Sequence, residues 1–234
     1  MSSALNSILK RVGGLAGATF ASRLLGFFRE ILTASILGGG TIASAWSLAF
    51  MVPNLCRRVF GEGLLATVLI PMMTHTIERY GHDTARRRFS TIFIWLSLVL
   101  CVITVIVSSV SMMLLPFASA PRVELTLKLI PLVMPYCIFI CLIGAMTSLM
   151  NSIKVFFLPA LVSLGLNICM ILCLWLVCPL FRAEPPKMLD ALAVSVLLSG
   201  ALELALMLFL LRKHDFLPVF SRKTLHGLRA IVEI

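Results

Sequence analysis

The stretch FSTIFIWLSLVLCVITVIVSSVSMMLLP, residues Phe89–Pro116, decides the fold class of this chain. None of its 28 residues is Asp, Glu, Lys or Arg. A helix needs about 20 mostly apolar residues to cross the hydrocarbon core of a bilayer. This stretch is therefore long enough to form a transmembrane helix.

The same pattern recurs along the rest of the chain. Three further runs lack charged residues, and they are Ile31–Cys56, Leu129–Ile153 and Val155–Phe181. Across the 234 residues, 60% are hydrophobic and 13% are charged, whereas soluble domains carry about 25% charged residues. The sequence predicts an all-α, polytopic membrane helix bundle. It excludes a soluble domain, a disordered chain and a disulfide-stapled secreted module.

We expect six transmembrane helices followed by a basic tail. Residues 1–211 are predicted to form one lobe, and residues 212–234 a basic cytoplasmic linker with the start of a seventh helix. A charged loop from Glu78 to Arg88 is expected between the second and third spans. The six expected spans are Val12–Leu37, Ile42–Thr76, Phe89–Pro116, Leu125–Asn151, Phe156–Leu180 and Met188–Leu211.

The net charge of +10 follows the predicted topology. With the N-terminus inside, twelve Lys and Arg residues fall in cytoplasmic segments and three in outside loops. Cytoplasmic loops of membrane proteins collect Lys and Arg. We therefore expect both termini in the cytoplasm, and we expect no nucleic-acid partner despite the basic charge.

Four arginines lie in the first two spans, at or near membrane depth: Arg23, Arg29, Arg57 and Arg58. Charged side chains at this depth are costly, and they usually face a cavity, water or an opposite charge. Only two acids, Glu30 and Glu62, accompany them. Arg58 and Glu62 are four residues apart, so they can pair on one helical face.

Two interpretations of these arginines remain open. They can snorkel to the interface or pair within the bundle, or they can line a cationic cavity for an anionic ligand. Arginine suits phosphate because its planar guanidinium donates two parallel hydrogen bonds and keeps its charge in a low dielectric. Pro53 and Asn54 are predicted to break the second helix, and broken helices at membrane depth line cavities.

Glu203 lies inside the sixth span and is a candidate coupling site for a proton or a cation, as is Glu30. The alternative for Glu203 is a hydrogen bond within a helix interface. Asn167, in the fifth span, is expected to form an interhelical hydrogen bond. The sequence holds no nucleotide-binding loop, metal-ligand spacing or nucleophile motif, so we expect no cofactor, no metal and no enzymatic activity.

Two segments resemble a known family. The segments SRLLGFFRE (Ser22–Glu30) and PNLCRRVFGEG (Pro53–Gly63), followed by Pro71, resemble the MurJ/MviN family of bacterial lipid II flippases, in the MOP exporter superfamily. The resemblance continues more weakly through Pro135, Asn151 and Asn167.

The resemblance implies a function in cell-wall synthesis. Members of the family move the lipid-linked peptidoglycan precursor, lipid II, from the inner to the outer leaflet of the bacterial cytoplasmic (inner) membrane by alternating access between two lobes. It also implies that Arg23, Arg29 and Arg57 line a cationic cavity that holds the diphosphate or the sugar–peptide head. In the same motif, Arg58 and Glu62 are expected to form a gate or structural pair. The expected partners are lipid II and membrane lipids.

The chain departs from the family pattern in two ways. Members commonly have Asp where this chain has Ser44, and they carry a second lobe of further spans. We therefore expect an N-terminal lobe only, which would need a C-terminal lobe or a second chain. The alternatives are another exporter of the superfamily, for drugs or polysaccharide lipids, and a non-transporting membrane scaffold for cell-wall proteins.

Overall fold

The computed structural model describes residues 2–58, 65–162 and 164–219. All of the regular secondary structure in these residues is helical, as the sequence predicts. The longer helices are α1 (Ser2–Leu37), α2 (Thr41–Cys56), α3 (Leu65–Tyr80), α4 (His82–Leu114), α5 (Pro121–Val133), α6 (Pro135–Ser152), α7 (Phe157–Val162), α8 (Gly165–Leu172) and α9 (Pro185–Lys213).

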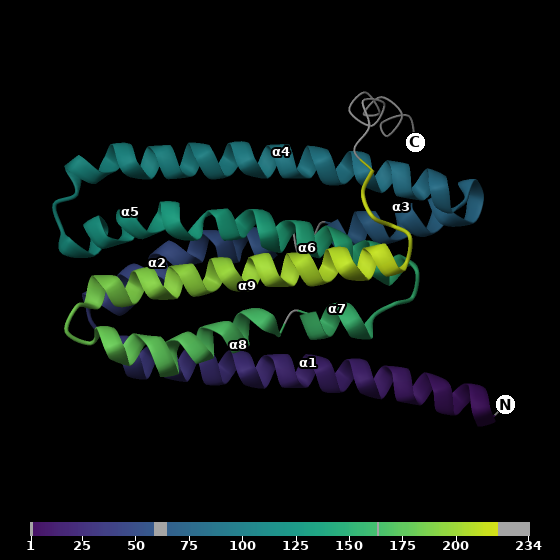
Figure 1. The fold of residues 1–234 in the computed structure, drawn as a ribbon, viewed down its shortest axis with the longest axis horizontal. Helices are drawn as coiled ribbons and strands as arrows, with labels where there is room; N and C mark the ends of the chain where they lie inside the picture. The colour runs from purple at the N-terminus through teal and green to yellow at the C-terminus, as the bar shows by residue number, and fades with distance from the viewer. Residues whose placement is uncertain (1, 59–64, 163, 220–234) are drawn as a thin grey trace.

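The helices lie along one common axis, and their connections alternate between the two ends of the molecule (Figure 1). The turns that follow α1, α4 and the α8 segment lie at one end. The turns between α3 and α4 and between α6 and α7, and the end of α9, lie at the other. This up-and-down course matches six passes of the chain along the bundle.

Four helical stretches of the described residues are long and apolar enough to cross a membrane: residues 82–117, 135–152, 157–181 and 185–213. Helix α4 is the most open of them, with exposed apolar side chains such as Val102, Val105 and Met113. A continuous exposed apolar surface of this kind suits lipid and is rare on a soluble monomer. The chain is a multi-pass membrane protein.

The predicted charged loop from Glu78 to Arg88 is wrong. Helix α3 continues to Tyr80 and α4 begins at His82, so Gly81 alone connects them. Gly81 has φ +80°, a conformation that glycine adopts readily because it has no Cβ. Arg86 and its basic neighbours lie in α4, because Arg and Lys are good helix formers and need no loop.

Three predicted spans are divided in the structure. The second corresponds to α2 and α3, which flank residues outside the described part of the chain. The fourth is α5 followed by α6, and the two meet at Met134 and Pro135; Pro135 has no N–H for an intrahelical bond, which favours a boundary there. The fifth is α7 and α8, followed by a π-helical and a 3₁₀ segment that end at Phe181.

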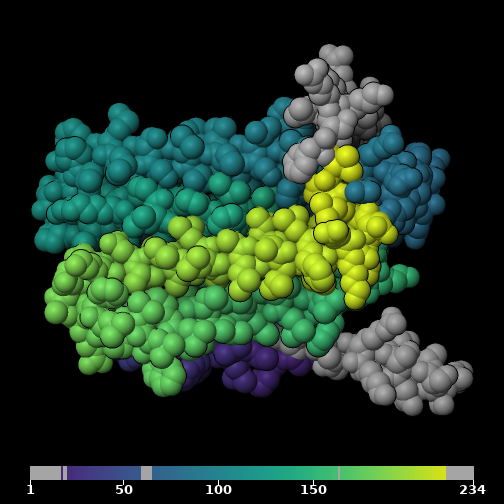
Figure 2. All heavy atoms as spheres, in the orientation of Figure 1, coloured from purple at the N-terminus to yellow at the C-terminus, as the bar shows by residue number. Residues whose placement is uncertain are grey.

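The interior holds two main apolar clusters. One joins α2, α5, α8 and α9 around Trp46, Val133 and Leu189. The other joins α3, α4, α6 and α9 around Phe89 and Met146. Helix α9 contributes to both, and the space-filling view shows it lying between α4 and α8 on this face (Figure 2).

The predicted boundary after residue 211 is displaced, because α9 continues to Lys213. Residues 214–219 then turn back toward the beginning of α4 (Figure 1). Phe216 is 1% exposed and packs 3.9 Å, ring centre to ring centre, from His82. The described start of the expected linker is therefore docked on the bundle, while residues 220–234 lie outside the described residues.

Candidate functional site

A cavity of about 220 Å³ lies between α1 and α2. Its wall is polar on the α1 side and mostly aromatic or apolar on the α2 side. The residues that line it are Arg29, Glu30, Thr33, Trp46, Ser47, Phe50, Met51, Asn54 and Met170, the last from α8.

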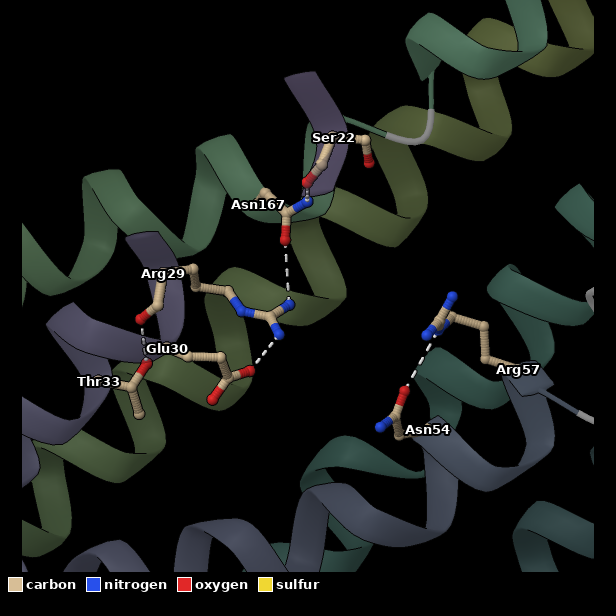
Figure 3. Close-up of polar contacts among 7 residues, drawn as sticks. All are labelled: Ser22, Arg29, Glu30, Thr33, Asn54, Arg57 and Asn167. Carbon is tan, nitrogen blue, oxygen red and sulfur yellow. Dashed lines mark hydrogen bonds and ion pairs between the residues drawn. The ribbon is translucent and has the colours of Figure 1, made fainter. Parts of the chain in front are cut away.

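Arg29, one of the predicted cavity arginines, is largely enclosed, with a side chain 16% exposed. Its Nη1 donates a hydrogen bond to Oδ1 of Asn167 on α8 at 3.1 Å. Its Nη2 pairs with the carboxylate of Glu30, the adjacent residue. Figure 3 shows the guanidinium extending from α1 between these two partners. Arg29 is therefore a fixed charge at the wall of the cavity.

Small residues let α1 approach α8 at this point. A Cβ added to Gly26 would lie 3.9 Å from both polar atoms of the Asn167 amide. The Asn167 Nδ2 faces the backbone carbonyl of Ser22 at 3.5 Å. Close approach through small residues is typical of helix contacts in membranes. The interhelical hydrogen bond predicted for Asn167 is thus present in the structure.

Arg57 follows α2 directly and is half-buried. Its Nε donates to Oδ1 of Asn54 at 3.2 Å. Figure 3 shows the side chains of Arg29 and Arg57 extending toward each other from α1 and α2. Two cations from separate helices therefore converge on one region of the bundle.

The other predicted charges lie elsewhere. Arg23 is exposed on α1, outside the lining of the cavity. It lies six residues before Arg29, which is about 120° around a helix, so the two side chains leave α1 on different faces. Arg58 is exposed beyond the end of α2. Glu62, its predicted partner, lies outside the described residues.

The break predicted at Pro53 and Asn54 requires a correction. Helix α2 continues through both residues to Cys56, and Arg57 and Arg58, the last described residues before residue 65, are π-helical. Proline removes one intrahelical hydrogen bond but leaves those on either side, so the helix can pass through it. The helix therefore ends beyond the proline, next to Arg57.

An aromatic stack borders the cavity and was not anticipated from the sequence. Trp46 and Phe50 are stacked, with ring centres 5.4 Å apart and planes 9° apart. Phe50 in turn stacks on Tyr136 at 6.3 Å. The i, i+4 spacing of Trp46 and Phe50 places them on one face of α2. That spacing was the only sequence signal for the stack, because Tyr136 on α6 lies 86 residues after Phe50 in the chain.

Glu203 lies within α9 and is 1% exposed. Its Oε1 accepts a hydrogen bond from the backbone N–H of Leu166, in the first turn of α8, at 2.5 Å. A Cβ on Gly165 would lie 2.8 Å from this oxygen, so any larger residue there would force the Glu203 side chain to shift. Glu203 thus makes the hydrogen bond within a helix interface that was predicted from the sequence as its alternative role. A coupling role for Glu203 stays a prediction. Glu30 is a largely exposed partner of Arg29.

Within the described residues, no group of three or more His, Cys, Asp or Glu side chains could hold a metal ion. The cavity instead presents the guanidinium of Arg29 beside one carboxylate, Glu30, and Arg57 lies outside the lining next to Asn54. Because Arg29 balances Glu30, the second arginine, Arg57, supplies the excess positive charge that would favour an anion, and arginine donates hydrogen bonds in a fixed fork.

Comparison with known proteins gives consistent results. The chain is 34% identical over 206 residues to a probable lipid II flippase MurJ of Rhizobium tropici, covering 85% of this chain and 38% of that protein. It is 29% identical over 223 residues to the lipid II flippase MurJ of Burkholderia cenocepacia, covering 92% of this chain and 42% of that protein. The chain thus spans about two fifths of the length of these relatives.

The fold also matches a solved structure, a lipid II flippase MurJ in an inward closed conformation. The TM-score is 0.72 at 22% identity, over 94% of this chain and 45% of the other. The family model for lipid II flippase MurJ matches residues 33–233. With most of its length matched by that model, the chain belongs to the lipid II flippase MurJ family.

Proposed function

We propose that this chain forms the N-terminal lobe of a lipid II flippase, and that Arg29 and Arg57 bind the diphosphate of the lipid-linked peptidoglycan precursor. The observation that carries the proposal is the convergence of these two side chains from separate helices (Figure 3). The protein would act in the bacterial inner membrane with both termini in the cytoplasm. It would move its substrate without making or breaking a covalent bond, so it is not an enzyme.

The electrostatics of the cavity favour a diphosphate. Such a group carries about two negative charges, and two guanidiniums can balance them with bidentate hydrogen bonds. Attraction between opposite charges strengthens several-fold when water gives way to protein and lipid, because the effective dielectric constant falls. One carboxylate, Glu30, borders the same space. Arg29 alone balances the charge of Glu30, so Arg57 would keep the site cationic.

Arg23 is proposed as an entry contact. It lies on the same helix as Arg29, roughly 9 Å further toward the N-terminus at 1.5 Å per residue, and its side chain is exposed. An exposed cation at this distance would attract the diphosphate before Arg29 binds it.

Flipping itself is proposed for an assembly of this lobe with a C-terminal lobe, in the same chain or in a second one. Alternating access requires two bodies that rock about a central site. The chain covers only 42% of the Burkholderia cenocepacia relative, so the remaining part of that relative offers a partner lobe for an experiment.

The test replaces the matching N-terminal part of the Burkholderia cenocepacia flippase with residues 1–234 in cells depleted of their own flippase. A membrane-impermeant enzyme that cleaves lipid II measures the precursor at the outer leaflet, alongside protein level. We expect the chimera to restore outer-leaflet lipid II, and Arg29→Ala and Arg57→Ala each to reduce it at least about tenfold. The exposed Arg58→Ala is the matched control. Normal flipping by the Arg29→Ala/Arg57→Ala chimera would refute the proposal.

A further inference from the structure

We propose that Asn167 is a positioning residue that aims Arg29 into the cavity, and that Glu203 fixes Asn167 by holding the first turn of α8. The inference rests on the proposed function, in which Arg29 binds a lipid diphosphate. It assigns the orientation of that arginine to two helices, α8 and α9, that lie far from α1 in the sequence.

The Asn167 amide is placed to hold one orientation of Arg29. The residue is 8% exposed, so water competes little for its polar atoms. Its Oδ1 accepts from Arg29 at 3.1 Å, and its Nδ2 faces the Ser22 carbonyl at 3.5 Å. With one end of the amide directed to the α1 backbone, the other end presents its oxygen to the guanidinium (Figure 3).

A neutral amide suits this role better than a carboxylate would. Arg29 already pairs with Glu30, and a second acid would neutralise the charge that an anionic ligand needs. Asparagine accepts one hydrogen bond without adding a negative charge, so it leaves the other guanidinium N–H groups of Arg29 available and the net charge of the site unchanged. The side chain therefore sets direction without reducing the attraction to phosphate.

Glu203 sets the position of Asn167 through the backbone. Its carboxylate accepts the N–H of Leu166, the residue immediately before Asn167, at 2.5 Å. The first N–H groups of a helix have no partner within the helix, so this bond holds the beginning of α8 against α9. Gly165 permits the contact because any Cβ there would lie 2.8 Å from the Glu203 oxygen. The resulting series of contacts runs from Glu203 through Leu166 and Asn167 to Arg29.

The competing explanation is that Asn167 only stabilises the packing of α1 against α8. Energetic coupling between Asn167 and Arg29 distinguishes this explanation from the positioning role. If Asn167 only holds helices together, its loss should weaken ligand binding whether or not Arg29 is present. If Asn167 acts through Arg29, its loss should have no further effect once Arg29 is removed. A double-mutant cycle measures this difference directly.

The experiment uses the whole 234-residue chain in lipid nanodiscs and measures affinity for undecaprenyl diphosphate, with uncharged undecaprenol as reference. We expect Asn167→Ala to weaken diphosphate binding about tenfold, the size of one hydrogen bond to a charged group. In the Arg29→Ala background the same change should cost less than about twofold. Ser22→Ala, which keeps the backbone carbonyl facing Asn167, is the matched control and should bind as the unaltered chain does.

Three further variants test the roles assigned to Glu203 and Asn167. Glu203→Gln keeps an oxygen that can accept the Leu166 N–H, so it should bind within about twofold of the unaltered chain. Glu203→Leu removes that acceptor and should resemble Asn167→Ala, again only when Arg29 is present. Asn167→Asp keeps an acceptor but adds a negative charge, so it should bind more weakly than Asn167→Ala. Thermal unfolding of each variant separates lost binding from lost folding.

The outcomes distinguish the two proposals. If the unaltered chain shows no preference for the diphosphate over undecaprenol, or if Arg29→Ala leaves that preference intact, the proposed function fails and this inference fails with it. If Arg29→Ala weakens binding but Asn167→Ala does not, only the positioning role is overturned. Equal losses from Asn167→Ala in the unaltered chain and in the Arg29→Ala background also overturn the positioning role. Packing of α1 against α8 would then be the explanation.

Discussion

The Nε of Arg86 in α4 donates a hydrogen bond to the backbone carbonyl of Leu217 at 2.8 Å, joining residues 131 positions apart. Ser90, one turn further along α4, accepts the N–H of Val219 at 2.9 Å. Together these bonds attach the segment after α9 to the beginning of α4. Whatever follows residue 219 therefore starts from a fixed position on the bundle.

Phe216→Ala should release this segment. The side chain is 1% exposed beneath His82, and truncating a buried Phe costs about 3–5 kcal/mol when the site cannot collapse. Limited proteolysis after Lys213 and thermal unfolding in detergent should both show the loss. Phe209→Ala on α9, where the side chain is 65% exposed, is the control. Equal effects of the two changes would contradict the docking.

Gly165→Ala should destabilise the contact between α8 and α9. The added Cβ would lie 2.8 Å from Oε1 and 2.9 Å from Cγ of Glu203, and forcing extra volume into a packed site costs about 1–3 kcal/mol. Gly26→Ala is the matched control, because its Cβ would meet Asn167 at an ordinary 3.9 Å. Thermal unfolding should place Gly165→Ala well below Gly26→Ala, and the reverse order would show that the α8–α9 contact is loose.

Topology can be tested by labelling introduced cysteines on intact cells. Ser119, in the α4–α5 connection, and Asp83, at the start of α4, are both exposed and lie at opposite ends of α4. A membrane-impermeant thiol reagent should label Ser119→Cys from outside and Asp83→Cys only after the membrane is opened. The opposite pattern would place both termini outside and would reverse the orientation inferred from the charge count.

Lysine substitutions should separate Arg57 from Arg58. Arg57→Lys loses the planar fork and the Nε that donates to Asn54, so diphosphate binding should fall about tenfold. Arg58 is exposed beyond α2, and Arg58→Lys should bind as the unaltered chain does. The nanodisc affinity measurement described above provides the readout. Equal sensitivity at both positions would assign ligand contact to Arg58 as well.

The sequence by itself determined the class of fold and the set of charged residues that fall within the spans. Long charge-free runs leave a chain no stable alternative to membrane-spanning helices, because lipid cannot satisfy free backbone groups. The scarcity of charge also made each remaining arginine informative, so Arg23, Arg29, Arg57 and Arg58 could be singled out in advance. These features are local, and a composition count or a helical period captures them.

Local pattern failed at the ends of helices. Charged residues from Glu78 to Arg88 suggested a loop, yet one left-handed glycine connects two helices that both accept charge. Pro53 suggested a break, yet the neighbouring hydrogen bonds carry α2 to Cys56. In each case the free energy gained by continuing the helix outweighed the local preference of charged residues or proline for a loop or a break.

Only the tertiary structure decided which side chains meet. Arg29 and Asn167 are 138 residues apart, and Leu166 and Glu203 are 37 apart. No spacing within one helix encodes such pairs, because they depend on how α1, α8 and α9 pack and on glycines that let them approach. The sequence supplied the charges of the site, whereas packing between distant helices decided where each charge points.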